Sequence, residues 1–117
     1  MAHHNELGQK GEELAAEYLV KNNFKILYRN WTFKHLEIDI IALKEGVLHF
    51  VEVKTRNSLQ FGYPEEDVTK KKLKNVINAA SEFQYQNPGW EKIQFDVLSI
   101  ILLPDKEEYF FIEDIYV

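Results

Sequence analysis

Hydrophobic and polar positions along the chain follow two periods, and each change of period marks a predicted element. Apolar residues recur at helical spacing in two stretches, and in five others they alternate or run on as in strands. The pattern predicts a helix over residues 7–21, strands over residues 24–33, 36–43 and 47–56, a helix from Pro64 to about Gln84, and strands over residues 92–103 and 108–117. Between the second and third strands, Lys44-Glu45-Gly46 predicts a tight hairpin with Gly46 at positive φ.

The order α-β-β-β-α-β-β, without an internal repeat or linker, predicts a single α/β domain over residues 1–117, with residues 1–6 frayed. The composition is that of a globular protein, with 45% hydrophobic and 28% charged residues. There are no cysteines, which excludes disulfides and thiolate zinc sites and leaves oxygen-ligated metals. No apolar run is long enough to span a membrane and no signal segment is evident, so we expect a cytoplasmic protein without membrane contact.

The predicted hairpin carries charges inside apolar strands. Glu37 and Asp39 lie in its first strand, and Glu52 and Lys54 lie in its second. Residues two apart on a strand share a face, so a hairpin can bring the two pairs together. Charges in such strands cost free energy unless they are paired or bind a metal. The hairpin is therefore the candidate site.

An acid on one strand, and an acid and a lysine two apart on the next, are what metal-assisted phosphodiester hydrolysis requires. Asp39 and Glu52 would hold Mg²⁺ or Mn²⁺ through carboxylate oxygens, and the Lys54 cation would orient the attacking water or stabilise developing negative charge. The alternative is a structural ion pair in the sheet, between Lys54 and either carboxylate.

Charge is unevenly distributed, although the net charge is −5. Residues 1–75 contain 12 Lys and Arg against 11 Asp and Glu, whereas residues 76–117 contain 2 against 8. A polyanion would therefore meet the first two-thirds of the chain, where Arg56, Lys70 and Lys72 are candidate phosphate contacts. A lysine run on a helix is also typical of a solvated face.

Several motifs resemble a known family in the same order. They are Gly8-x-x-Gly11-Glu12-x-x-Ala15-x-x-Tyr18-Leu19, Arg29-Asn30-Trp31, Glu37-Ile38-Asp39-Ile40-Ile41-Ala42, Phe50-Val51-Glu52-Val53-Lys54-Thr55-Arg56, Phe61-Gly62, Val68 with Lys72, and Phe95-Asp96-Val97. Together they resemble the bacterial YraN family, which is assigned to the restriction-endonuclease-like PD-(D/E)xK superfamily and is similar to Holliday junction resolvases.

The resemblance implies a restriction-endonuclease-like fold, with a mixed central sheet flanked by helices. It implies that Asp39, Glu52 and Lys54 form the active-site motif and that Glu12 adds a metal ligand from the first helix. Leu36 stands where the family usually has Gly, and Gln94 stands where it usually has Arg. The second departure removes a phosphate contact, and neither affects a metal ligand.

These observations lead to one hypothesis and a rival. The first is a Mg²⁺- or Mn²⁺-dependent endonuclease (hydrolase) that acts on branched or structured DNA, with a homodimer expected by analogy with resolvases. The rival is a nucleic-acid-binding or protein-interaction module that kept the fold while its chemistry faded. The full set of Asp39, Glu52 and Lys54 favours the enzyme, and the acidic balance favours the module.

Overall fold

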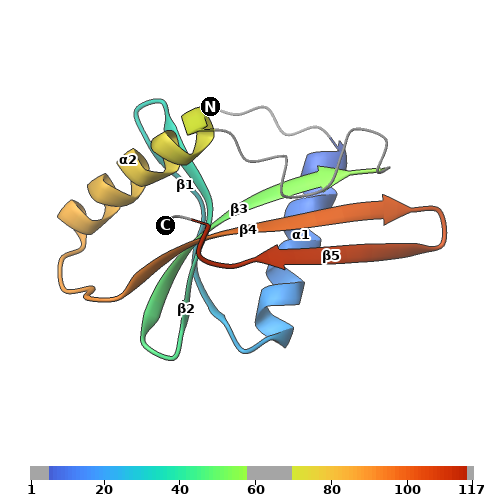
Figure 1. Ribbon diagram of the computed structural model, residues 1–117, viewed down its shortest axis with the longest axis horizontal. Coiled ribbons are helices and arrows are strands. Elements are labelled where there is room, and N and C mark those ends of the chain that lie inside the picture. Colours follow the sequence, from blue (N-terminus) through green and yellow to red (C-terminus); the bar gives the residue numbers. More distant parts are fainter. Residues whose placement is uncertain (1–5, 58–69, 116–117) are drawn as a thin grey trace.

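The computed structural model describes residues 6–57 and 70–115 (Figure 1). The elements are α1 (Glu6–Lys21), β1 (Lys25–Phe33), β2 (Leu36–Lys44), β3 (Val47–Arg56), α2 (Lys70–Gln86), β4 (Ile93–Leu103) and β5 (Lys106–Ile112). This order is the predicted one. No helix within the described ranges has both the length and the apolar character needed to cross a membrane.

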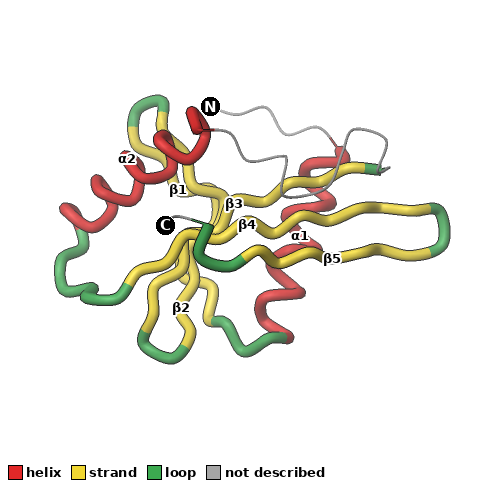
Figure 2. Tube along the Cα trace, in the orientation of Figure 1, coloured by secondary structure: helices red, strands yellow, loops and turns green. Residues whose placement is uncertain are grey.

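The five strands form one mixed sheet in the order β1-β2-β3-β4-β5 (Figure 2). Neighbouring strands are antiparallel except for β3 and β4, which run parallel and are joined through α2. The β2–β3 hairpin turns at Glu45 and Gly46, whose φ angles are 51° and 79°. The prediction of positive φ at Gly46 is confirmed, and the same turn also holds Glu45 in the left-handed region.

The two helices cover opposite faces of the sheet (Figure 1). On one face α2 packs Val76, Ala79, Ala80 and Phe83 onto apolar side chains of β2, β3 and β4. On the other face α1 packs Ala15 and Leu19 onto the same strands. A mixed sheet flanked by helices is therefore confirmed, and each face has its own apolar core.

Helix α1 approaches β3 closely at Gly11. A Cβ atom added to Gly11 would lie 1.8 Å from the Thr55 hydroxyl oxygen, which is far inside van der Waals contact. Only a glycine allows the helix to cross β3 at this distance. The crossing fixes the neighbouring Glu12 against the sheet, where its side chain is buried.

Two element boundaries differ from the prediction or cannot be compared with it. The predicted helix start at Pro64 and residues 1–5 of the predicted frayed segment lie outside the described residues, and Glu6 already belongs to α1. The last strand ends at Ile112, so its predicted extension to residue 117 is wrong over the described residues 113–115. Asp114 has a φ of 52° there, and its N–H donates to a carboxylate oxygen of Asp96. This contact turns the chain back onto β4.

Candidate functional site

Strands β2 and β3 pair along only part of their length. Their register runs from Lys44 opposite Val47 to Ile40 opposite Val51 and goes no further. The alternation of β2 is interrupted at the same point, because Ile38 packs under α2 whereas Ile40 packs under α1. In a regular strand these two side chains would share a face. The strands therefore separate at Asp39, the residue between them.

Asp39 occupies the point of separation. Its side chain is only 8% exposed, and one carboxylate oxygen accepts a hydrogen bond of 2.8 Å from the backbone N–H of Val53. The N–H of a central strand is thus bound by a side chain, beyond the last pair of the ladder. The break in the alternation of β2 directs the Asp39 carboxylate toward β3.

Glu52 faces Asp39 across this gap, close enough for its side chain to act on the Asp39 carboxyl group. Burial, followed by the charge and hydrogen bond of Glu52, raises the pKa of Asp39 from 3.8 to about 8. The Val53 N–H and the charge of Lys54 act in the opposite direction but are weaker. The protonated form of Asp39 is therefore favoured at neutral pH, as expected for a buried carboxyl group close to a second acid.

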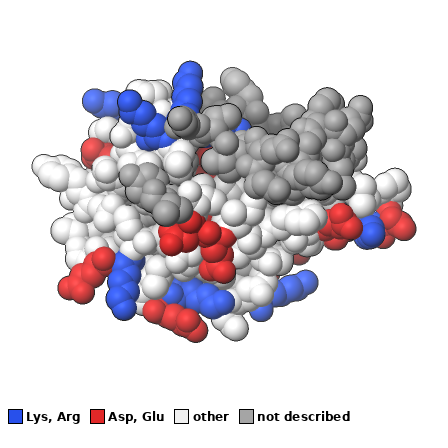
Figure 3. Space-filling model, viewed as in Figure 1, with Lys and Arg blue, Asp and Glu red and all other residues white. Residues whose placement is uncertain are grey.

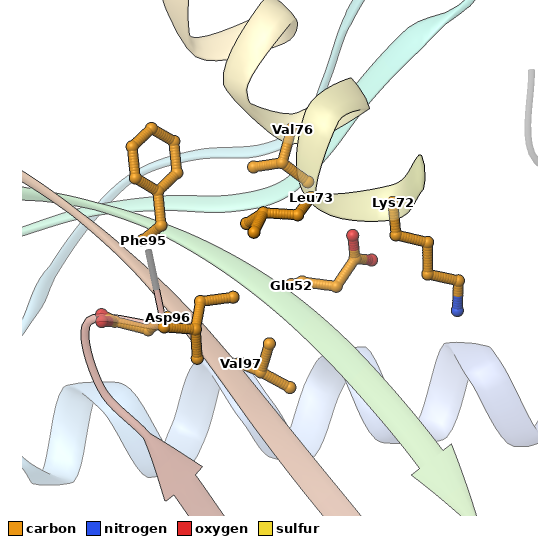
Figure 4. Close-up of a pocket in the computed structure, with 8 residues that line it drawn as sticks. Glu52, Lys72, Leu73, Val76, Phe95, Asp96 and Val97 are labelled. Carbon is orange, nitrogen blue, oxygen red and sulfur yellow. The ribbon is translucent and has the colours of Figure 1, made fainter. Parts of the chain in front are cut away.

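A pocket of about 170 Å³ opens over the pair. Its walls come from the β1–β2 turn, the two separated strands and α2, and they comprise His35, Leu36, Glu37, Asp39, Glu52, Lys72, Asn75 and Val76. Glu52 also borders a small apolar pocket under α2 (Figure 4). In that view its carboxylate points toward α2, where Lys72 lies beside it. The lysine thus borders both pockets.

Lys54 and Arg56 follow Glu52 on the same face of β3, and both are half-buried. The positive charge of Lys54 lowers the pKa of Asp39, so the amine lies within electrostatic reach of that carboxylate. The structure therefore brings together Asp39, Glu52, Lys54 and Lys72 around one gap in the sheet.

Glu12 lies elsewhere. Together with Arg29 and Asn30 it lines a different pocket, formed by α1 and β1. No three His, Asp or Glu side chains in the described ranges are arranged to hold a metal ion together. Two of the three predicted ligands are thus adjacent, and the third, Glu12, stays a prediction.

The predicted phosphate contacts are partly described. Lys72 is half-buried at the pocket, Lys71 and Lys74 are exposed, and the side chain of Lys70 lies outside the described residues. Figure 3 shows basic side chains gathered over the beginning of α2, whereas the tip of the β4–β5 hairpin is mainly acidic. The basic end of α2 is therefore the end nearest the carboxylates.

Comparison with known proteins assigns the sequence that carries this site to a family. The sequence pattern of the uncharacterised protein family UPF0102 matches residues 11–100. The chain belongs to the UPF0102 family. The resemblance to YraN-like proteins is thereby confirmed.

UPF0102 relatives match over most of their length. The chain is 49% identical to a UPF0102 protein of Flavobacterium johnsoniae over 104 residues, which cover 86% of this chain and 85% of the relative. It is 42% identical to one of Chloroherpeton thalassium over 118 residues (93% and 92%). It is 40% identical to one of Bacteroides fragilis over 101 residues (86% and 84%). These names state a family and no activity.

This UPF0102 chain also contains a polar cluster that the sequence reasoning missed. His49 of β3 and Asp96 of β4 are buried, and the His49 Nδ1 atom lies 2.6 Å from an Asp96 carboxylate oxygen. The other Asp96 oxygen accepts hydrogen bonds of 2.9 Å from the Gln94 side chain and from the Asp114 N–H. The sequence did show His49 and Asp96 as polar residues within apolar strands. Their contact depends on the parallel register of β3 and β4, which the sequence pattern does not indicate.

Sequence reasoning also missed His35 and Asn75 as pocket residues. Asn75 follows Lys72 by three positions in α2, so the helical period places both on the same side of the helix. Helical spacing from Lys72 was the signal that could have identified it. His35 lies in the β1–β2 turn, and its place in the pocket depends on how α2 lies against that turn, which no local pattern indicates.

Proposed function

We propose that the chain is a divalent-cation-dependent endonuclease that hydrolyses phosphodiester bonds of branched or otherwise structured DNA. The observation that carries the proposal is the Asp39–Glu52 pair, two carboxyl groups held together at a gap in the sheet where the ionised form of Asp39 is disfavoured. A dominant structural ion pair with Lys54 would lower the Asp39 pKa, whereas burial and Glu52 outweigh the Lys54 charge and raise it.

The donor set fits a hard cation. Carboxylate oxygens are the ligands that Mg²⁺ and Mn²⁺ prefer, and a positive ion between Asp39 and Glu52 would relieve the repulsion that raises the Asp39 pKa. Bound there, such an ion supplies Lewis acidity and an activated water. Glu12, the third predicted ligand, lines another pocket and would complete the ligand shell of such an ion from α1.

The remaining residues act on the substrate through charge. Lys54, close to Asp39, orients the attacking water and stabilises the negative charge that develops on the phosphate. Lys72 borders the pocket from α2 and is placed to bind the phosphate on its outer side. Arg56, farther along β3, extends the same basic face.

The test is cleavage of labelled four-way junction, flap, single-stranded and duplex substrates with Mg²⁺ or Mn²⁺. We expect products from the branched substrates, and none with Asp39→Asn, Glu52→Gln or Lys54→Ala. Lys92→Ala is the matched control, because Lys92 is an exposed lysine in the acidic third and should leave cleavage unchanged.

A second candidate is a binding module of the same fold, favoured by the net charge of −5 and by the two-member carboxylate set. Junction binding that is undiminished by Lys54→Ala, without product from the wild-type protein at any concentration, would establish the module and overturn the enzyme. We further propose a homodimer, which sedimentation of the free protein and of its junction complex would detect as twice the monomer mass.

A further inference from the structure

Ser99 places a buried hydroxyl group beside Lys54 in the β3–β4 register. Ser99 is 2% exposed, and its Oγ atom has no hydrogen-bond partner within the part of the chain that the structure describes. A buried hydroxyl without a partner destabilises a fold, since it has lost its water and gained no replacement. It interrupts the apolar run of β4, where an alanine or valine would carry no such cost.

The sheet register places this hydroxyl next to the lysine. Ser99 is the direct partner of Lys54 across the parallel β3–β4 ladder, so both side chains leave the same face. Across the other ladder Ser99 pairs with Phe110 of β5, and two positions away on β4 stand Val97 and Ile101. These neighbours are apolar and offer no donor.

Donors on this face come from β3. The Lys54 ammonium group has three N–H donors and no acceptor, and its four-carbon stem is flexible enough to bend over a neighbouring strand. Arg56, the next donor on the face, is paired with Ile101 rather than with Ser99. Lys54 therefore has Asp39 of β2 on one side and the Ser99 hydroxyl of β4 on the other, and Glu52 precedes it by two positions on β3.

We propose that Ser99 is a positioning residue for Lys54, and this inference rests on the proposed nuclease function. When the carboxylates are engaged by a cation, the ammonium group loses them as acceptors and is repelled by the ion. The Ser99 hydroxyl then accepts a hydrogen bond from the Lys54 Nζ atom and holds the amine at the edge of the site. Burying this hydroxyl lowers the stability of the fold, and in return the hydroxyl fixes the orientation of the Lys54 side chain.

The first test does not depend on cleavage. Ser99→Ala and Ser99→Thr are compared with the wild-type protein by nuclear magnetic resonance of ¹⁵N-labelled lysine side chains, with and without Mg²⁺. We expect the Lys54 Nζ signal in Mg²⁺ to move and to exchange hydrogens at least threefold faster in Ser99→Ala, and to return in Ser99→Thr. The Lys92 signal is the internal control and should not change.

Melting temperature distinguishes positioning from a structural role. Because the Oγ atom has no hydrogen-bond partner among the described residues, Ser99→Ala should melt at the wild-type temperature or above it. A lower melting temperature together with an unchanged Lys54 signal would overturn the inference and make the hydroxyl structural. A shift of the Arg56 guanidinium signal without a shift of Lys54 would overturn it as well.

The second test uses junction cleavage. Ser99→Ala should lower kcat about fivefold to twentyfold with little change in KM, and Ser99→Thr should restore it, since only the hydroxyl differs in hydrogen bonding. An unchanged kcat in an active enzyme would reject the positioning role. If the wild-type protein cleaves nothing, the proposed function fails, while the lysine signal still decides whether Ser99 binds Lys54.

Discussion

Two buried aspartates stand in the same sheet, Asp39 on β2 and Asp96 on β4 with β3 between them, and their surroundings are opposite. Asp96 is 1% exposed and accepts hydrogen bonds from the Gln94 side chain and the Asp114 N–H, with the His49 imidazole on its other oxygen. Asp39 accepts a single backbone hydrogen bond from Val53 and otherwise faces another acid, Glu52.

The difference separates a carboxylate with hydrogen-bond donors around it from one whose charged form burial and a second acid disfavour. Asp96 has donors on both oxygens, so its burial ties β3, β4 and the C-terminal segment together. Burial and the neighbouring Glu52 both disfavour the charged form of Asp39, and they raise its pKa to about 8. An unfavourable charge of this kind is expected where a bound ligand compensates it, which is the physical reason for proposing the site at Asp39.

The largest effect should come from removing the satisfied carboxylate. Asp96→Ala leaves His49, Gln94 and the Asp114 N–H without their acceptor, and we expect the free energy of unfolding to fall by about 3–5 kcal/mol. Urea denaturation at pH 7 measures it, with Asp105→Ala in the exposed β4–β5 turn as the control. A loss below about 1 kcal/mol would erase the contrast between the two aspartates.

Asp39→Asn should act in the opposite direction in metal-free buffer. Between pH 4 and pH 8 the folded protein retains a proton that the unfolded chain has released, so stability falls as the pH rises, by up to about 1.4 kcal/mol per pH unit. The variant should remove this slope and so raise the free energy of unfolding at pH 8. Denaturation from pH 4 to pH 9 with EDTA measures both, and lower stability at pH 8 would support a structural ion pair instead.

Divalent cations should stabilise the protein through the same pair. Mg²⁺ or Mn²⁺ at one hundred times its dissociation constant should add about 2.7 kcal/mol, because it binds the folded state. The gain should be smaller at pH 5 than at pH 8, since the proton on the Asp39–Glu52 pair competes with the ion. Thermal melts with and without the metal measure it. Asp39→Asn should abolish the gain, and a gain that survives this substitution would place the ion elsewhere.

The smallest effect concerns the outer lysines. Lys72 borders the Asp39 pocket, so Lys72→Ala should weaken DNA binding similarly across sequences and flatten the log–log salt dependence by about 0.9. Lys92→Ala, in the acidic third, should change neither. Fluorescence anisotropy at several salt concentrations measures both variants, and identical slopes would mean that the beginning of α2 is only a solvated face.

Local sequence patterns were sufficient to predict the features that arise within one hairpin or one helix. The adjacency of Asp39 and Glu52 follows from strands joined by a two-residue turn, and the buried stripe of α2 follows from its period. The contact of Asp96 with His49 spans 47 residues and depends on a parallel register, which no local pattern specifies. The end of β5 was mispredicted for the same reason, because a distant carboxylate captures the N–H of Asp114.

Glu12 illustrates a different limit. The helical period placed it beside the buried stripe of α1, and the structure does bury it, yet in a pocket with Arg29 and Asn30. Which pocket it enters depends on how α1 crosses β3 at Gly11, and crossing geometry is set by tertiary packing rather than by sequence period. The break in the alternation of β2 at Asp39 likewise could not be predicted, because the apolar residues on both sides of it look the same in the sequence.

The parallel pairing of β3 with β4 has a consequence for how the chain assembles. Strands β1, β2 and β3 form a meander of local contacts, whereas β4 joins only after residues 57–92 have been made and folded back. Until then β3 is an unpaired edge strand, the kind of surface on which chains aggregate. Glu52, Lys54 and Arg56 place one negative and two positive charges along that strand, and charged side chains on an edge strand disfavour pairing with another chain.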